Sequence, residues 1–210
     1  GIFEGYNSAL FVDRAGEAGL RYDKQHRVIF GEYVPLAKTF PFLYKFTPLT
    51  GGTEAGTEAK SLEFAGARLA PSICYETALA RVIRRQVAEL RDRGEEPDVL
   101  VNVTNDGWFW GSSELDLHLA CAVFRAVEMR KPLVVAANTG FSAHIDSDGR
   151  ILAQGPRQAR GFINAATRLD RRRFTVVTAE GGLAEITAYL DEQLDDPDHE
   201  AAGSGIPDPV

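Results

Sequence analysis

Asp98 to Val103 reads DVLVNV, a short and nearly continuous apolar run. Such a run is typical of a strand that is buried on both faces. Apolar residues at helical spacing precede it over residues 79–90 and follow it over residues 115–130. Further extended runs occupy residues 68–73 and 133–137. This alternation of strands and helices predicts an α/β fold.

Hairpin patterns lie on both sides of the alternating region, and they favour a mixed sheet over a purely parallel one. Turn-rich residues separate the expected strands, for example Gly66 and the run Ser147-Asp148-Gly149. The expected hairpins pair residues 7–13 with a stretch ending at 24, 62–64 with 68–73, and 142–146 with 151–154, while 162–167 and 174–178 are expected to be further strands.

The two expected helices carry start, stop and packing signals. Thr77 is a candidate cap for the first helix, and Gly94 is a candidate stop. The second helix ends before Pro132. Its apolar residues on one side predict the face that packs on the core. They are Leu117, Ala120, Cys121, Phe124 and Val127.

Charge divides the chain unevenly. The net charge is -7, yet residues 180–210 hold nine carboxylates and no lysine or arginine, which leaves residues 1–179 with about +2. We therefore expect a domain over residues 1–178 and an acidic, flexible tail over residues 179–210, with a short amphipathic helix at 183–190. The acidic balance argues against nucleic acid as a partner. No apolar run reaches the roughly 20 residues of a membrane span.

Cys74 is the first candidate for chemistry. It ends a buried-type strand just before a helix, where the helix dipole stabilises a thiolate. A buried structural cysteine is an equally good interpretation of the position alone. Cys121 lies on an apolar helix stripe, so core packing is the better interpretation there.

Lys24 also ends an apolar strand, where an ammonium group could stabilise an oxyanion. Taken alone, a solvated surface lysine is the more frequent case. His26, His118 and His144 lack the spacing and companion ligands of a metal site, so we interpret them as structural or as supporting an active site from behind, and we expect no cofactor.

The loop after the central strand reads Asn105-Asp106-Gly107-Trp108-Phe109. It could be only a turn with aromatic anchors. Two large aromatic residues at the carboxyl end of a strand also suit the wall of a substrate pocket.

Taken together, short motifs in order over about residues 5 to 155 resemble the nitrilase (carbon-nitrogen hydrolase) superfamily. Members of this superfamily use a Glu, Lys and Cys triad. The branch they resemble is that of the apolipoprotein N-acyltransferases. The motifs are YNSAL (6–10), YDK (22–24) with His26, FGEYVP (30–35), ICYE (73–76), NDGWF (105–109), RAVE (125–128) and NTG (138–140).

The resemblance implies roles for individual residues. Cys74 would be the nucleophile that carries an acyl group as a thioester, Lys24 would stabilise the oxyanion, and Glu32 would order the lysine. The backbone N–H after Cys74 would assist at the oxyanion. Substrate-binding or supporting roles would fall to Tyr75, Glu76, Asn105, Trp108, Phe109 and His118.

The resemblance also implies a fold, partners and a location. The fold would be a four-layer αββα sandwich with mixed sheets, with residues 40–44 in an arm over the site. The partners would be a phospholipid acyl donor, a diacylglyceryl lipoprotein acceptor and a membrane surface. The parent protein would lie in the bacterial inner membrane with this domain on the periplasmic face.

The family's general-base glutamate lies upstream of the position of Tyr6, and Glu4 is too close to that motif to replace it. The chain starts at Gly1, and its only methionine is Met129. We therefore expect a fragment that lacks its first strand and has little activity alone. Two alternatives remain open: a soluble nitrilase-class amidase that hydrolyses a carbon-nitrogen bond, and a non-catalytic relative that binds lipid or a partner.

Overall fold

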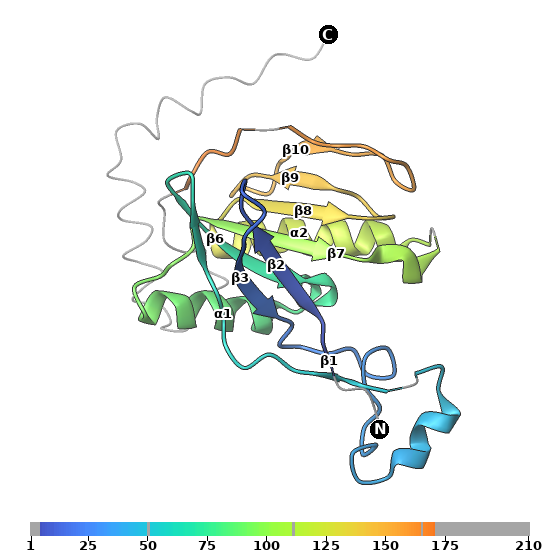
Figure 1. Cartoon of the computed structure of the whole chain (residues 1–210). Helices are drawn as coiled ribbons and strands as arrows, with labels where there is room; N and C mark the ends of the chain where they lie inside the picture. Colours follow the sequence, from blue (N-terminus) through green and yellow to red (C-terminus); the bar gives the residue numbers. More distant parts are fainter. Residues whose placement is uncertain (1–4, 50, 111, 165, 171–210) are drawn as a thin grey trace, which may run out of the picture. The chain divides into compact units, whose positions relative to one another are not determined.

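The computed structural model describes residues 5–49, 51–110, 112–164 and 166–170, which belong to the first of two units, Gly1–Arg173. The described strands include a six-stranded mixed sheet (Figure 1). In spatial order its strands are β10 (Ile151–Gln154), β9 (Ala143–Ile145), β8 (Leu133–Ala137), β7 (Val99–Thr104), β6 (Ala67–Ile73) and β5 (Leu62–Phe64). β6, β7 and β8 run parallel, whereas β5, β9 and β10 pair antiparallel with their neighbours. The predicted mixed α/β architecture is confirmed.

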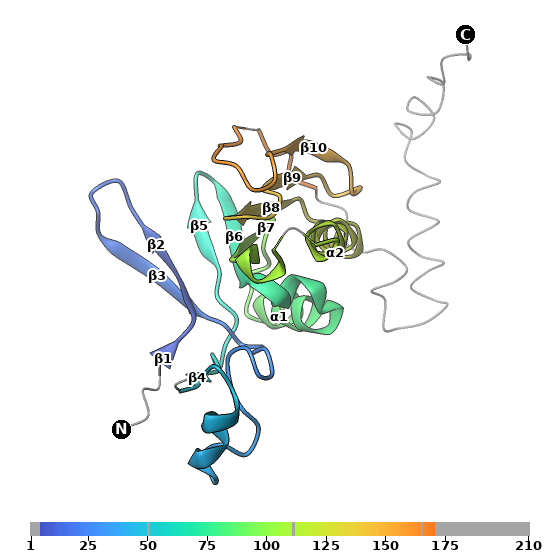
Figure 2. The same ribbon diagram turned by 90° about the vertical axis from the view of Figure 1, so that its right-hand side faces the viewer.

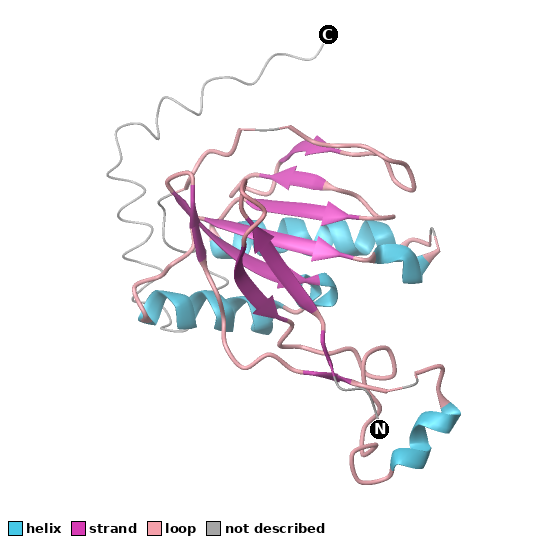
Figure 3. Ribbon diagram, viewed as in Figure 1, coloured by secondary structure: helices cyan, strands magenta, loops and turns pink. Residues whose placement is uncertain are grey.

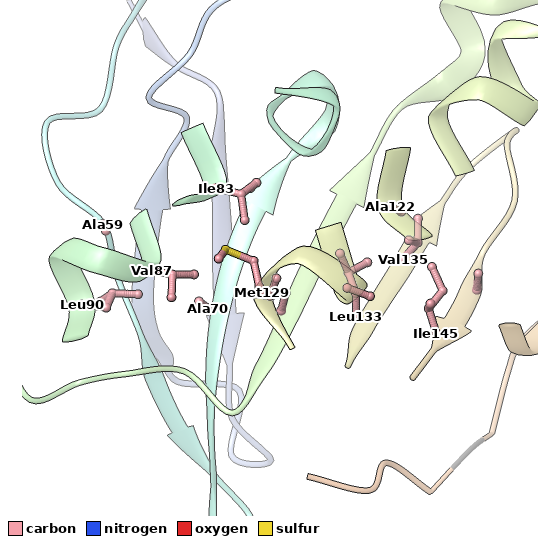
Figure 4. Close-up of a cluster of buried hydrophobic side chains, with 13 residues drawn as sticks. Ala59, Ala70, Ile83, Val87, Leu90, Ala122, Met129, Leu133, Val135 and Ile145 are labelled. Carbon is pink, nitrogen blue, oxygen red and sulfur yellow. The ribbon is translucent and has the colours of Figure 1, made fainter. Parts of the chain in front are cut away.

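Two helices connect the parallel strands and cover one face of the sheet (Figure 2). α1 (Ala80–Asp92) joins β6 to β7, and α2 (Glu114–Met129) joins β7 to β8. Apolar side chains from both helices pack on β6, β8 and β9 to form the core (Figure 4). In the described part of the chain, no helix has the length and apolarity needed to cross a membrane.

The hairpin of β2 (Ser8–Val12) and β3 (Ala18–Asp23) lies on the opposite face of the sheet from the helices (Figure 2). It reaches the sheet edge through the rings of Phe11 and Phe64, whose centroids are 5.8 Å apart. Beyond it, β1 (Gly5–Tyr6) pairs in parallel with β4 (Thr53–Glu54). The long loop between β3 and β4 contains the 3-10 helix η1 (Pro41–Phe46) (Figure 3).

The first helix starts later than Thr77 predicted. A 3-10 turn, η2 (Cys74–Ala78), follows β6, and α1 begins only at Ala80. Thr77 is fully buried, and its hydroxyl lies 3.2 Å from that of Ser72 instead of capping the helix. Thr77, which the sequence suggests as a helix cap, is therefore a buried hydrogen-bonding residue. Gly94 does end the helix region, with a φ of +73°.

The expected core face of α2 is wrong. Leu117 and Phe124 are 55% and 64% exposed, while Leu115, Ala122, Ala126 and Met129 are buried. Both sides of this helix are apolar, so the spacing alone could not select the inner one. Cys121 is half-buried on the outer side rather than in the core.

The strand expected at 162–167 is absent among the described residues of that range, which have no regular structure. In the described sheet β10 is the edge strand, and no further strand pairs with it. The strand expected at 174–178, the helix at 183–190 and the acidic tail all lie outside the described residues.

Candidate active site

The candidate site lies where the three parallel strands end. Cys74 follows β6, Asn105 follows β7 and Asn138 follows β8. Because the carboxyl ends of parallel strands meet at one edge of a sheet, the turns that follow them converge. Loops at this edge are the usual binding positions of α/β sheets.

Cys74 has a φ of +51°, a left-handed conformation that costs a non-glycine residue free energy. Hydrogen bonds to its backbone carbonyl hold this conformation. Asn102 Nδ2 lies 3.2 Å from the Cys74 oxygen and 3.1 Å from Ser72 Oγ, and His118 Nε2 lies 3.2 Å from the same Cys74 oxygen. Strained residues that their surroundings hold in place cluster at functional sites.

Glu76 links the Cys74 turn to the loop that carries Lys24. In the described part of the chain, its fully buried carboxylate accepts hydrogen bonds from four donors. They are the Tyr22 hydroxyl at 3.0 and 2.9 Å, and the backbone N–H groups of Gln25 at 2.7 Å, His26 at 2.9 Å and Ile73 at 2.8 Å. Burial, followed by the Glu76 charge, raises the pKa of Tyr22 well above its ordinary value, so the phenol stays a donor.

Lys24 is a buried lysine, only 1% exposed, contrary to the usual surface position. Its Nζ donates to Glu32 Oε2 at 2.8 Å. Glu32 also accepts from Asn7 Nδ2 at 2.7 Å and from the Val28 N–H at 2.8 Å. Burial raises the pKa of Glu32, but these hydrogen bonds outweigh it and hold the pKa below its ordinary value. The pair is thus a buried ammonium beside an ionised carboxylate.

The backbone of Lys24 is fixed as well. Its N–H donates to the Asn7 carbonyl at 2.9 Å, and its carbonyl accepts from the Gly56 N–H at 2.8 Å. A Cβ at Gly56 would lie 2.0 Å from the Asp23 carbonyl oxygen. Only glycine permits this close approach of two backbone segments.

Asp106 supports His118 from the next turn. His118 Nδ1 lies 3.0 Å from Asp106 Oδ1, which also accepts from Thr104 Oγ1 at 2.6 Å. Burial raises the pKa of Asp106, but the hydrogen bonds from His118 and Thr104 outweigh it and lower the pKa. Gly140 packs against the same carboxylate, since a Cβ there would lie 2.0 Å from Asp106 Oδ2.

Hydrogen bonds therefore join Lys24 to Glu32 and His118 to the Cys74 carbonyl. Glu76 links these two pairs indirectly, because it binds the backbone just before Cys74 and just after Lys24. The remaining predicted residues lie at the surface of this edge. Tyr75 is 42% and Trp108 is 72% exposed, and Phe109 is half-buried in the 3-10 turn η3 (Asp106–Phe109). Asn105 shapes that turn, because its side-chain oxygen accepts from the Gly107 N–H at 3.2 Å and from Asn138 Nδ2 at 2.6 Å.

Two hollows lie in the surrounding loops. One, of about 630 Å³, is lined by η3, the end of β8 and residues 158–161, including Trp110, Asn138 and Arg160. The other, of about 220 Å³, lies within the loop between β3 and β4 and is lined by Arg27, Tyr33 and Tyr44 among others. In this loop Phe42 and Phe46 of η1 are exposed.

Sequence reasoning missed several residues that hold the site. Asn7 binds Glu32, Tyr22 binds Glu76, Asn102 binds the Cys74 carbonyl and Asp106 binds His118. Asn102 could have been found, because a polar residue inside an apolar strand must find a hydrogen-bond partner when buried. Nothing in the sequence indicates which residue each of the others meets across the fold.

Solved structures resemble this fold. A CN-hydrolase superfamily protein from Xanthomonas campestris superposes with a TM-score of 0.55 at 17% identity, over 97% of this chain and 66% of that one. An amidase from Nesterenkonia sp. gives a TM-score of 0.51 at 19% identity, over 73% and 52% of the two chains. These likenesses confirm the predicted nitrilase-like α/β fold.

Curated relatives are similar in sequence. An apolipoprotein N-acyltransferase from Rhodopirellula baltica is 35% identical over 169 residues, covering 80% of this chain and 30% of the relative. One from Geobacter metallireducens is 39% identical over 163 residues, covering 78% and 30%. The predicted resemblance to this branch is confirmed, and the chain spans about 30% of the length of these relatives. The family model for carbon-nitrogen hydrolases matches residues 1–175, and the chain belongs to that family.

Proposed function

We propose that this chain is the acyl-transfer domain of an apolipoprotein N-acyltransferase. Such an enzyme would move an acyl chain from a phospholipid, through a thioester, to the N-terminal cysteine amine of a lipoprotein. The observation that carries the proposal is the buried Lys24–Glu32 pair, with Nζ and Oε2 2.8 Å apart, on a loop fastened by Glu76 to the Cys74 turn. Relatives at 35% and 39% identity named apolipoprotein N-acyltransferase support the substrate class.

In the first half-reaction, Cys74 Sγ attacks the ester carbonyl as a thiolate. The tetrahedral oxyanion is stabilised by the Lys24 ammonium and by the Tyr75 N–H, which lies at the start of the 3-10 turn η2. The carbon–oxygen bond of the ester then breaks. The acyl group stays on sulfur, and the released oxygen of the lysophospholipid takes up from solvent the proton that the thiol gave to solvent when it ionised.

In the second half-reaction, the lipoprotein amine attacks the thioester carbonyl. The carbon–sulfur bond breaks, an amide forms, and the amine proton passes to solvent or returns to the thiol. Glu32 keeps the lysine charged and oriented through both steps, because a buried ammonium without a carboxylate partner is strongly disfavoured. Trp108 and Phe109 would form part of the wall that binds the acyl chain, and Asn105 would shape it.

We assign this chemistry to residues 1–178 and place the site at a membrane surface, on the periplasmic face of the inner membrane. The exposed Phe42 and Phe46 in the loop between β3 and β4 support this placement, because exposed aromatic side chains suit the membrane interface. A phospholipid acyl donor also supports a site at a membrane surface.

The test uses the full-length gene product in vesicles of phospholipid with a radiolabelled acyl chain. We expect a hydroxylamine-sensitive label on the protein, lost in Cys74→Ala and retained in the matched variant Cys121→Ala, whose thiol is half-buried on α2. A diacylglyceryl peptide should discharge the label into an amide. Equal labelling of Cys74→Ala would overturn the proposal, and release of ammonia from simple amides without lipid labelling would favour an amidase.

A further inference from the structure

His118 has both ring nitrogens against oxygen atoms. Nδ1 lies 3.0 Å from Asp106 Oδ1, and Nε2 lies 3.2 Å from the backbone oxygen of Cys74. The side chain is 9% exposed, and that of Asp106 is 3% exposed, so bulk water does not separate these groups.

The chemistry of these partners restricts which nitrogens of the ring can carry a proton. A backbone carbonyl only accepts hydrogen bonds, and an ionised carboxylate does the same. A neutral imidazole has a single N–H and would therefore turn a lone pair towards one of the two oxygens. In the remaining arrangement the Asp106 carboxyl group would supply the second proton, but its Oδ1 already accepts from Thr104 Oγ1 at 2.6 Å, as an ionised carboxylate does.

We infer that His118 carries a proton on both ring nitrogens and acts as a charged positioning residue beneath the Cys74 turn. Asp106 holds the second proton in place. The imidazolium fixes the Cys74 carbonyl and lends positive charge to the neighbourhood of the thiol. This role goes beyond the proposed function, which uses only Cys74, Lys24 and Glu32 for the chemistry.

The hydrogen bond also acts on the peptide group that it touches. The Cys74 carbonyl and the Tyr75 N–H belong to one amide, so donors on the oxygen draw electron density away from the nitrogen. Asn102 and His118 both donate to this oxygen. The Tyr75 N–H therefore becomes a stronger donor to an oxyanion, and this part of the inference rests on the proposed function.

Other charged groups near α2 do not replace this charge. η2 carries Glu76, which is satisfied by its own donors, and η3 carries Asp106. β8 has no titratable side chain, and β9 has His144, which lies 3.1 Å from Thr167 Oγ1. On α1, Arg84 is paired with Glu128. Glu128 lies on α2, about 15 Å along that helix from His118.

The test measures alkylation of Cys74 by iodoacetamide as a function of pH in the full-length gene product, quantified by mass spectrometry of the Cys74 peptide. His118→Gln keeps a donor to the Cys74 carbonyl but removes the charge. Asp106→Asn removes the group that holds the second proton. In both variants we expect the pH midpoint of alkylation to rise by about one unit, because an opposite charge nearby favours the thiolate.

His144→Gln is the matched control, since it changes another buried histidine on β9 and should leave the midpoint unchanged. Thermal unfolding of each variant checks that it is folded, and Asp106→Asn decides the matter if His118→Gln does not fold. A midpoint that stays at the wild-type value in a folded variant would overturn the inference. Alkylation requires no acyl transfer, so this result is independent of the proposed function.

Discussion

The hydroxyl of Tyr22 lies 2.9 Å from Glu76 Oε2, although 54 positions separate the two residues, and both are fully buried. Tyr22→Phe removes one donor from a buried carboxylate, which should lower the free energy of unfolding by about 1–3 kcal/mol. Urea unfolding measures the change. Tyr6→Phe, at a half-exposed position, is the control and should be nearly neutral. Equal stability of Tyr22→Phe and wild type would contradict the anchoring role of Glu76.

Glu32 makes the fold sensitive to acid. Its pKa is held below the ordinary value of 4.5, so it contributes stability above that pH and loses the contribution as the pH falls through the folded-state pKa. Between about pH 5 and about pH 2, wild type should lose more stability than Glu32→Gln. Denaturant midpoints at several pH values measure this difference. If the denaturant midpoints of the two proteins change with pH in parallel, the partners of Glu32 do not stabilise its ionised form.

Gly56 should not tolerate a side chain. In Gly56→Ala the new methyl group meets the Asp23 carbonyl, so the segment that holds the Lys24 backbone must move, at a cost of about 1–3 kcal/mol. Gly155→Ala is the matched control, because a Cβ there makes ordinary contacts at 3.6 Å. Differential scanning calorimetry compares the two. Equal melting temperatures for both variants would sink the idea that Gly56 positions the lysine loop.

The strained backbone at Cys74 predicts that this residue lowers the stability of the folded protein. Cys74→Gly relieves the positive φ, whereas Cys74→Ala keeps it, and both remove the thiol. We expect Cys74→Gly to be more stable than Cys74→Ala by about 1 kcal/mol, despite the greater flexibility of glycine in the unfolded chain. Guanidinium unfolding of the two variants gives the difference. A less stable glycine variant would mean that the turn is not strained.

The two apolar sides of α2 should respond differently to truncation. Leu115→Ala should cost about 2–5 kcal/mol, because Leu115 is 1% exposed. Leu117→Ala should change the stability by no more than about 0.5 kcal/mol, because Leu117 is 55% exposed. Thermal melts of the pair distinguish the faces. Comparable losses of stability in both variants would show that Leu117 packs in the core.

Much of the architecture could be predicted from local patterns. The strand at 98–103 and the helices around it follow from the periodicity of apolar residues, which reports burial directly. The inner face of α2 could not be predicted, because Leu115 and Leu117 are equally apolar and only the packing partner decides between them. The 3-10 turn at 74–78 was also missed, since its hydrogen bonds depend on Glu76 meeting a distant loop.

The site was predicted as a set of residues but not as a geometry. Lys24 looks like a surface lysine in the sequence, and only its contact with Glu32 in the fold explains its burial. The roles assigned to Cys74, Lys24 and Glu32 stay predictions. Asp106 escaped notice because an Asp-Gly pair is a common turn signal, and its partner His118 is twelve positions away.

The hydrogen bonds of Glu76 have a mechanical consequence. Because one carboxylate holds both the Cys74 turn and the loop at 22–26, these two segments can shift only as a single body. The loop between β3 and β4 is attached to that body through the contact of Glu32 with Lys24 but exposes most of its aromatic side chains. Deformation of this outer loop would therefore leave the Cys74 turn and the segment at 22–26 in their mutual arrangement.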